Sequence, residues 1–377
     1  MEFETRAIHG NVEEKKEKFF GSTIDMASAF PIKKFGEEQD FVYSRSGSPT
    51  KRDLEEVLAN LENGKYAYVF SSGMGATNAV MTLFQSGDHI IVGADVYGGT
   101  YRIIKEMYPK FGIEYTFVDT TDLKNIENEI RENTKGILVE MPSNPLMDVT
   151  DIRGTVNIAK KHNILTIIDN TFLTPYLQRP LDLGADIVIH SATKFLAGHH
   201  DVMAGVVITN NEEIGEKIRF ALRTAGGVMS PFDSWLLIRS LKTLKVRMDA
   251  AQENTIRLIK FLEGHPAVKD ILYPTAENNK GKEIQESQAS GGGAVFSFRL
   301  KEDSKIATFF DRLKIAALAA SLGGTETLVT HPGTITHDDM PEEEREARGI
   351  TYSLIRVAVG LENINDLIED FRQALEE

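Results

Sequence analysis

The sequence contains no cysteine and a single tryptophan in 377 residues. A chain without cysteine can form no disulfide framework, thiolate metal site, iron–sulfur cluster or cysteine nucleophile. Basic residues are also in deficit: 42 lysines and arginines stand against 56 aspartates and glutamates, a formal net charge of −14. A broad nucleic-acid surface needs basic patches, so this balance predicts no nucleic-acid partner.

Long apolar runs are missing as well. No segment reaches about 18 consecutive apolar residues, so we expect no transmembrane helix and no membrane partner. The first 20 residues carry acidic side chains throughout and lack the apolar core of a signal peptide. The sequence therefore predicts a cytoplasmic protein. At about 150 residues per domain, its length allows two or three domains.

From about residue 52 the sequence alternates between helical and strand-like segments. The strand-like segments are near-continuous apolar runs, as expected where helices cover both faces of a sheet. This alternation indicates an α/β fold with a mostly parallel sheet. We expect a large domain over residues 51–232, with strands at 66–70, 89–93, 114–118, 136–141, 164–168, 186–190 and 205–209 and helices at 52–63, 76–85, 100–110, 122–132 and 151–162.

The pattern changes after Pro231. A long helical stretch at 233–262 is followed by strand-like segments at 268–272, 293–299 and 352–358 and by a closing helix at 363–375. These segments indicate a smaller α+β domain over residues 233–377. Residues 1–50 lack clear periodicity, yet they hold too many aromatic residues for a disordered tail: Phe19, Phe20, Phe30, Phe35, Phe41 and Tyr43. We expect them to form an arm that packs on another surface.

Residues able to carry chemistry follow the predicted strands, and ligands bind at the carboxyl ends of strands in open α/β sheets. Each has an ordinary explanation on its own, such as a turn, a helix cap or a solvated lysine. Together they match the needs of an aldehyde cofactor with a phosphate and a pyridine ring. Lys194 could react with the aldehyde, Asp169 could meet the ring nitrogen, the glycine-rich segment 71–76 could bind the phosphate, Tyr97 could stack on the ring and Asn144 could meet the ring oxygen.

Further motifs extend along nearly the whole chain, in the order YSRSGSPT, SSGMGA, DVYGGTYR, MPSNP, DNTF, SATKFLAGHHDVMAG, SLGGTETLVTHP and LIRVAVGLE. In these motifs the sequence resembles the Cys/Met-metabolism enzymes that use pyridoxal phosphate, the γ-family of fold type I. That family includes cystathionine γ-synthase, cystathionine β- and γ-lyases, methionine γ-lyase and O-acetylhomoserine sulfhydrylase. The resemblance implies a fold type I PLP-dependent transferase-like fold, pyridoxal 5'-phosphate as cofactor and a small amino acid as substrate.

The resemblance also implies roles for individual residues. Lys194 matches the lysine that bonds to the cofactor, Asp169 matches the carboxylate at the pyridine nitrogen, and Tyr97 matches a stacking tyrosine that also transfers protons. Lys194 and Tyr97 are thus the implied catalytic residues. The implied phosphate ligands are the backbone of Gly73 and Met74 and the hydroxyls of Ser191 and Thr193.

Other matches concern the substrate and the oligomer. Arg356 matches an arginine that grips the substrate carboxylate, Ser321 supports that contact, and Asn144 lies near both the cofactor and the substrate. Tyr43 and Arg45 match residues that reach the phosphate of a neighbouring subunit. The resemblance therefore implies shared active sites in a dimer, and a homotetramer built from such dimers.

Two departures from the family bear on the activity. Ala320 stands just before SLGG, where cystathionine γ-synthases and many cystathionine γ-lyases have a glutamate, and an uncharged residue suits an apolar tail such as that of methionine. Gly99 stands where methionine γ-lyases usually have a cysteine. We expect a carbon–sulfur lyase that converts sulfur amino acids to a 2-oxo acid, ammonia and a thiol. Methionine γ-lyase is the leading hypothesis, and the alternatives are cystathionine β- or γ-lyase and the γ-replacement enzymes, cystathionine γ-synthase and O-acetylhomoserine sulfhydrylase.

Different classes of protein are less consistent with the sequence. A metal site could be suspected at His199-His200-Asp201, but adjacent side chains rarely converge on one ion and the run lies inside a family motif, so we expect no metal. A non-catalytic binding protein would require Lys194 to be incidental.

Overall fold

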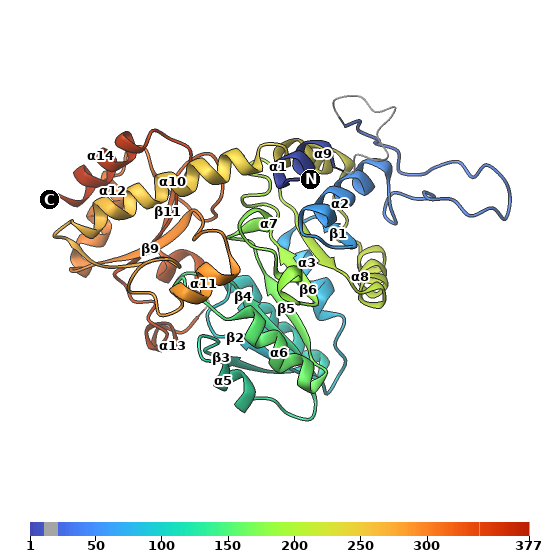
Figure 1. Cartoon of the computed structure of the whole chain (residues 1–377), viewed down its shortest axis with the longest axis horizontal. Coiled ribbons are helices and arrows are strands. Elements are labelled where there is room, and N and C mark those ends of the chain that lie inside the picture. The colour runs from blue at the N-terminus through green and yellow to red at the C-terminus, as the bar shows by residue number, and fades with distance from the viewer. Residues whose placement is uncertain (11–21, 339, 377) are drawn as a thin grey trace.

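The computed structural model describes residues 1–10, 22–338 and 340–376. The chain forms two sheets, each with its own helices, and the long helix α10 (Leu244–Glu263) runs along one side of the molecule (Figure 1). The larger sheet holds residues from the first 210 positions, and the smaller sheet holds residues from the last 110. This arrangement confirms the predicted α/β class with an additional α+β part. The boundaries of the predicted domains stay a prediction.

Seven strands form the larger sheet in the order β1-β7-β6-β5-β4-β2-β3. Neighbours from β3 to β6 run parallel, whereas β7 is antiparallel to both β6 and β1. Val206 and Ile208 on β7 belong to one buried cluster and Val207 to another, because side chains alternate between the two faces. The strands are β1 (Tyr66–Phe70), β2 (His89–Gly93), β3 (Glu114–Val118), β4 (Thr134–Glu140), β5 (Leu165–Asp169), β6 (Ile187–His190) and β7 (Gly205–Thr209).

Helices cover both faces of this sheet, which explains the apolar strands. Local signals fix several of their starts: Asp151, for example, accepts a 2.9 Å hydrogen bond from the Gly154 amide at the start of α6. The predicted helix 100–110 is instead a short α-helix followed by a π turn (Ile103–Met107) and a 3₁₀ turn (Tyr108–Phe111). The α-helices are α2 (Pro49–Leu61), α3 (Gly73–Met81), α4 (Gly98–Arg102), α5 (Leu123–Asn128), α6 (Ile152–His162), α7 (Thr174–Leu177) and α8 (Glu212–Ala225).

The smaller sheet has the strand order β10-β11-β12-β9-β8 and is antiparallel except between β10 and β11. Its strands are β8 (Val268–Leu272), β9 (Val295–Leu300), β10 (Ala317–Leu318), β11 (Leu328–Thr330) and β12 (Leu354–Ala358). Besides α10, the helices of this part are α9 (Pro231–Leu241), α11 (Lys282–Gln288), α12 (Ile306–Arg312), α13 (Glu342–Ala347) and α14 (Ile364–Leu375). The predicted helical stretch 233–262 consists of two helices, because the helix is interrupted at Lys242 and Thr243 between α9 and α10.

The N-terminal segment begins with α1 (Phe3–His9), which packs against α2 and α10. Residues 22–48 extend away from the body of the molecule (Figure 1). Apolar side chains on this arm lie in solvent: Phe35 is fully exposed and Ile32 is 56% exposed. The predicted aromatic residues Phe19 and Phe20 lie outside the described residues. Within the described part of the chain, no helix is long and apolar enough to cross a membrane.

Candidate active site

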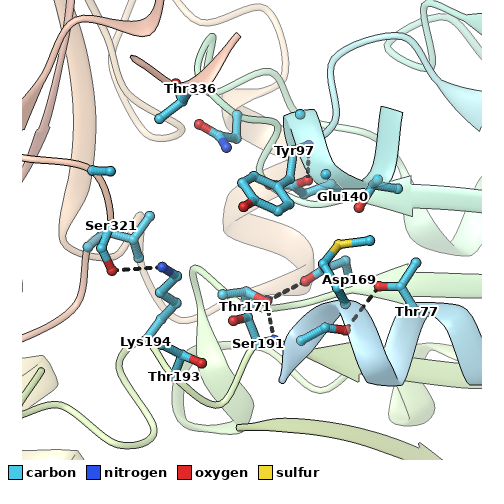
Figure 2. A pocket seen from close by; sticks show the side chains of 18 of the residues that line it. Thr77, Tyr97, Glu140, Asp169, Thr171, Ser191, Thr193, Lys194, Ser321 and Thr336 are labelled. Atoms are coloured by element: carbon cyan, nitrogen blue, oxygen red, sulfur yellow. Dashed lines mark hydrogen bonds between the residues drawn. The ribbon is translucent and has the colours of Figure 1, made fainter. Parts of the chain in front are cut away.

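A cavity of about 480 Å³ lies at the carboxyl ends of the parallel strands, between the two sheets (Figure 2). Loops after β2, β4, β5 and β6, the start of α3, and the segments 320–322 and 335–338 contribute to its wall. The fold brings together ten of the twelve predicted site residues here: Gly73, Met74, Tyr97, Asn144, Asp169, Ser191, Thr193, Lys194, Ser321 and Arg356. Tyr43 and Arg45 are not among the lining residues.

Lys194 lies in the loop after β6 and points into the cavity. Its Nζ donates a 2.7 Å hydrogen bond to Oγ of Ser321. Burial, and next the positive charge of Arg356, lower the pKa of Lys194 to about 8. The lowered pKa makes the neutral amine, which a nucleophile or general base requires, far more accessible near neutral pH than it is for an ordinary lysine.

Asp169 is the last residue of β5 and lies on the floor of the cavity. The amide and the hydroxyl of Thr171 both donate to its Oδ1, at 3.0 and 2.5 Å, and Oδ2 has no donor among the described residues. Burial raises the pKa of Asp169, and the two Thr171 hydrogen bonds oppose that rise. Thr171 also accepts a 2.8 Å hydrogen bond from the Ser191 amide, so it links the loops after β5 and β6. Thr171 was not among the predicted site residues.

The start of α3 forms the anion-binding end of the cavity. Ser72 caps the helix by accepting a hydrogen bond from the Gly75 amide. The amides of Gly73 and Met74 have no helical acceptor because they stand in the first turn. A Cβ at Gly73 would lie 2.8 Å from Oγ of Ser191, so only glycine lets this hydroxyl approach the helix end. Free amides at a helix N-terminus bind phosphate well.

Thr193 contributes differently from the prediction. Its hydroxyl donates to the Ala204 carbonyl at 3.1 Å and accepts from the Ala204 amide at 2.9 Å. The hydroxyl proton is therefore used within the protein, and the side chain fixes the loop that carries Lys194 against the start of β7.

Arg356 lies on β12 and is 2% exposed. Its guanidinium donates to Oδ1 of Asn144 at 2.9 Å and to the Ser321 carbonyl at 2.9 Å, but its Nε has no partner. No carboxylate of the described residues forms an ion pair with it. Burial lowers the pKa of Arg356 to about 10, so it remains a cation at neutral pH. An unpaired buried cation facing a cavity is suited to bind a carboxylate.

Tyr97 precedes α4 and borders the cavity across from Asp169, with 43% of its side chain exposed. Its backbone amide donates a 2.6 Å hydrogen bond to Oε2 of Glu140, the last residue of β4. Glu140 was not among the predicted site residues.

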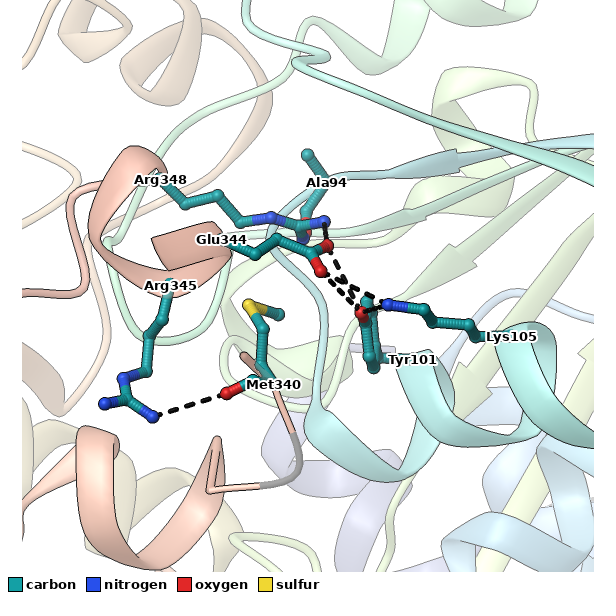
Figure 3. A network of polar contacts seen from close by, with 7 residues as sticks. All are labelled: Ala94, Tyr101, Lys105, Met340, Glu344, Arg345 and Arg348. Atoms are coloured by element: carbon teal, nitrogen blue, oxygen red, sulfur yellow. Dashed lines mark hydrogen bonds and ion pairs between the residues drawn. The ribbon is translucent and has the colours of Figure 1, made fainter. Parts of the chain in front are cut away.

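A segment of the smaller part closes one side of the cavity. Ile335, Thr336 and Asp338 line the wall, and the neighbouring helix α13 is fastened to the larger part (Figure 3). Glu344 forms ion pairs with Lys105 at 3.2 Å and Arg348 at 2.6 Å and accepts a 3.0 Å hydrogen bond from the hydroxyl of Tyr101. Arg348 also donates to the Ala94 carbonyl. These contacts hold the wall against the loop that carries Tyr97.

The histidine pair of the SATKFLAGHH motif has structural partners. Nδ1 of His199 lies 2.7 Å from the Ala197 carbonyl, and Nε2 of His200 lies 3.7 Å from a Glu326 carboxylate oxygen. Among the described residues, no group of three or more His, Asp or Glu side chains could hold a metal ion.

The two remaining predicted residues lie on the arm. Tyr43 is 47% exposed, and Arg45 lies over its ring, with 5.5 Å between the guanidinium carbon and the ring centre. The Arg45 guanidinium also donates to the Arg223 carbonyl. The arm therefore does not bring either residue to the cavity of its own chain.

A family model described as Cys/Met metabolism PLP-dependent enzyme matches residues 4–376. The chain belongs to this family. Cystathionine gamma-lyase of Bacillus subtilis (strain 168) is 45% identical over 377 residues, which is 100% of both chains. Cystathionine beta-lyase of the same organism is 46% identical over 94% of this chain and 91% of its own length. Cystathionine gamma-synthase of Haemophilus influenzae is 44% identical over 97% of this chain and 95% of its own length.

Solved structures agree with these relatives. A cystathionine gamma-lyase from Lactobacillus plantarum, complexed with L-serine, has a TM-score of 0.97 and 43% identity, covering 100% of this chain and 99% of that one. The predicted family, fold type I architecture and PLP cofactor are thereby confirmed, and so is membership in a family of PLP-dependent carbon–sulfur lyases and synthases.

The residues around the cavity fit PLP. Its two ends differ as the cofactor requires: free helix amides at Gly73 and Met74 suit the phosphate, and the unpaired Oδ2 of Asp169 suits the protonated ring nitrogen. Lys194 lies in the same cavity with a lowered pKa, and Tyr97 borders it from the other side. These residues would hold the cofactor.

Proposed function

We propose that the protein is a cystathionine lyase. The observation that carries this proposal is its full-length similarity to cystathionine lyases of other bacteria, at 45% and 46% identity and with a TM-score of 0.97 to a solved member. The named relatives give less support to methionine γ-lyase, which the sequence alone favoured. A synthase relative is also similar, so the reaction must be distinguished by experiment.

The cavity wall supports a substrate with a charged distal group. Ala320 offers no charge there, which was the reason to expect an apolar tail. Asp338, however, lines the same cavity and is exposed, and its carboxylate has no hydrogen bond or ion pair with another described residue. The distal half of cystathionine carries an ammonium group, and a free carboxylate can pair with it.

Each residue of the site has a separate role in the proposed reaction. When bound, PLP draws electrons from the carbon that carries the substrate amine. Arg356 binds the substrate carboxylate through its unpaired Nε, and Lys194 accepts and returns the proton of that carbon. Tyr97, as the second catalytic residue, delivers a proton to the departing sulfur. Gly73, Met74, Ser191 and the arm residues hold the phosphate.

The oligomer is part of the proposal. Tyr43 and Arg45 would complete the cavity of a neighbouring subunit, because they do not reach their own. We therefore propose a homotetramer of dimers, in which residues 1–50 form the exchanging arm, 51–232 the PLP-binding domain and 233–377 the smaller domain.

Product analysis tests the activity. The PLP-loaded protein is incubated separately with cystathionine, methionine and O-acetylhomoserine plus cysteine, and the oxo acid and sulfur product are identified. We expect cystathionine to be the preferred substrate: pyruvate would show cleavage on the β side and 2-oxobutyrate cleavage on the γ side. Faster release of methanethiol from methionine, or faster formation of cystathionine than its cleavage, would overturn the proposal. Lys194→Ala is the inactive control.

Asp338→Asn tests the substrate contact. Removing the carboxylate should raise KM for cystathionine about tenfold and leave KM for methionine nearly unchanged, because methionine has no distal ammonium. An equal rise in KM for both substrates would show that Asp338 does not bind the distal ammonium group of cystathionine. Glu343→Gln, an exposed change of the same charge in α13, is the matched control.

A further inference from the structure

Glu140 is a buried carboxylic acid in a place where a second charge is costly. It ends β4 in direct register with Asp169 at the end of β5, and side chains paired in this way on adjacent parallel strands lie on the same face of the sheet. Glu140 is 6% exposed and borders the cavity beside Tyr97 (Figure 2). Two carboxylates so close together in a dry site cannot both be charged without strong repulsion.

The surrounding groups decide which of the two carries the charge. Asp169 accepts two hydrogen bonds from Thr171, whereas Glu140 accepts one, from the Tyr97 amide. Burial and next the charge of Asp169 raise the pKa of Glu140 well above its usual range, and Asp95 adds to the rise, whereas the hydrogen bond from the Tyr97 amide and the charge of Arg356 oppose it. Asp169 would hold a protonated ring nitrogen of PLP when the cofactor is bound, and that positive charge would further favour the charged form of Asp169.

Tyr97 depends on this contact. It is the residue before the short helix α4, its side chain makes no capping hydrogen bond, and 43% of the side chain is exposed. Surrounding side chains therefore fix its ring incompletely. The 2.6 Å hydrogen bond from its amide to Glu140 fastens its backbone to the end of the central strand.

We propose that Glu140 is a positioning residue: as an uncharged acid it accepts a hydrogen bond from the Tyr97 amide, holds the tyrosine ring over the cofactor site and leaves the negative charge to Asp169. It acts through these two neighbours and does not itself exchange protons with the substrate. Glutamine has nearly the same shape and keeps the acceptor oxygen without a charge. Leucine has a similar volume and no acceptor.

Glu140→Gln and Glu140→Leu separate these features in the PLP-loaded protein. The visible circular dichroism of bound PLP, which responds to the orientation of the ring and its stacking partner, is measured without substrate and so does not depend on the proposed activity. The leucine variant should show altered dichroism and a kcat/KM lowered about 30-fold, the loss expected for one buried hydrogen bond. Glutamine should restore the dichroism and bring kcat/KM to within about threefold of the parent protein.

Two outcomes overturn the proposal. If glutamine is as damaging as leucine, the site needs a charged carboxylate at position 140. If the Glu140→Leu variant has unchanged dichroism and unchanged kcat/KM, the hydrogen bond from the Tyr97 amide does not position the tyrosine. Should the leucine variant fail to fold, the pH profile of the glutamine variant decides: it should match the parent below pH 7, and a lost acidic limb would show that Glu140 itself titrates in the reaction.

Discussion

Lys194 is the residue whose environment makes the clearest prediction about pH. Burial and the charge of Arg356 lower its pKa to about 8 from the ordinary 10.5. Only the neutral amine can react with an aldehyde, so the rate at which cofactor-free protein captures PLP should rise with pH, reach half its maximum near pH 8 and level off above about pH 9. Stopped-flow absorbance of the bound cofactor measures this rate. A rate that keeps rising toward pH 10 would contradict the lowered pKa, and Lys194→Ala shows the background.

Gly99 is the second residue with a distinct local role. A Cβ at this position would lie 2.5 Å from Cε1 of Tyr97 and 2.8 Å from Sδ of Met74. Both contacts are to mobile ends of side chains, so Gly99→Ala should fold, but the Tyr97 ring must move. We expect kcat/KM to fall about tenfold with little change in the unfolding midpoint.

Gly227→Ala is the matched control for this prediction, since its Cβ would make only an ordinary 3.7 Å contact with Phe70. Full activity of Gly99→Ala would contradict this prediction, because it would show that the Tyr97 ring accommodates the added methyl group without loss of function. Gly99→Cys adds the side chain common in methionine γ-lyases and should behave like alanine or worse if the glycine is fitted to this site.

The sequence predicted that several residues would meet at one edge of the sheet, and the structure places them around one cavity. Lys194 and Tyr97 follow strands and Asp169 ends one, and parallel strands bring such residues to the same edge. Glu140 was missed because it was read as the end of an apolar run before the MPSNP loop. Its role depends on register with β5, which no local pattern reveals. The hydrogen bonds between the Thr193 hydroxyl and the Ala204 backbone could not be predicted either, because they depend on how two loops meet in the fold.

At the level of elements, Arg247 on α10 connects α9 to the loop that carries Lys194. Its guanidinium lies 7% exposed between α9 and the loop that carries Lys194. It donates to the carbonyls of Phe195 at 2.7 Å, Leu196 at 3.4 Å and Ser240 at 3.0 Å. Burial lowers the pKa of Arg247 to about 10, which still leaves it charged at neutral pH.

Arg247→Met should therefore destabilise the protein and loosen PLP together. Buried carbonyls that lose a charged donor cost about 2–3 kcal/mol in the free energy of unfolding. Urea unfolding of the PLP-loaded protein and the PLP dissociation constant measure the two effects. Arg257→Met on the same helix removes only an exposed 3.1 Å contact with Asn365 and should change stability by less than about 0.5 kcal/mol. Equal midpoints for the two variants would refute the role of Arg247.

Some elements could not be predicted from the pattern alone. The apolar pattern runs through 233–262, so periodicity does not show that α9 ends at Leu241 and α10 begins at Leu244. Strands β10 and β11, of two and three residues, are too short for any pattern to appear. The parallel strands, by contrast, were placed within a residue or two, because their apolar runs are bounded by turns.

For the whole molecule, the decisive question is whether one chain makes a complete site. The cavity residues of a chain include Lys194 and Asp169, but Tyr43 and Arg45 lie on an arm that extends away from the body, with apolar side chains exposed on it. Exposed apolar side chains on an extended segment favour a docking partner. If that partner is a second copy of the chain, two inactive variants with substitutions in different parts of the site can form a complete active site in a mixed dimer.

Mixing Lys194→Ala with Arg45→Ala chains tests this directly. In a mixed dimer, the cavity of the Arg45→Ala chain keeps its lysine and receives an intact arginine from the other chain, so one of its two sites is whole. Random pairing at equal amounts makes half of the dimers mixed, so activity should recover to about a quarter of the parent value. Lys194→Ala mixed with Asp169→Ala is the control, because both residues line the cavity of one chain and no pairing restores a site. Recovery in the control, or none in the test mixture, would show that the arm does not complete its neighbour's site.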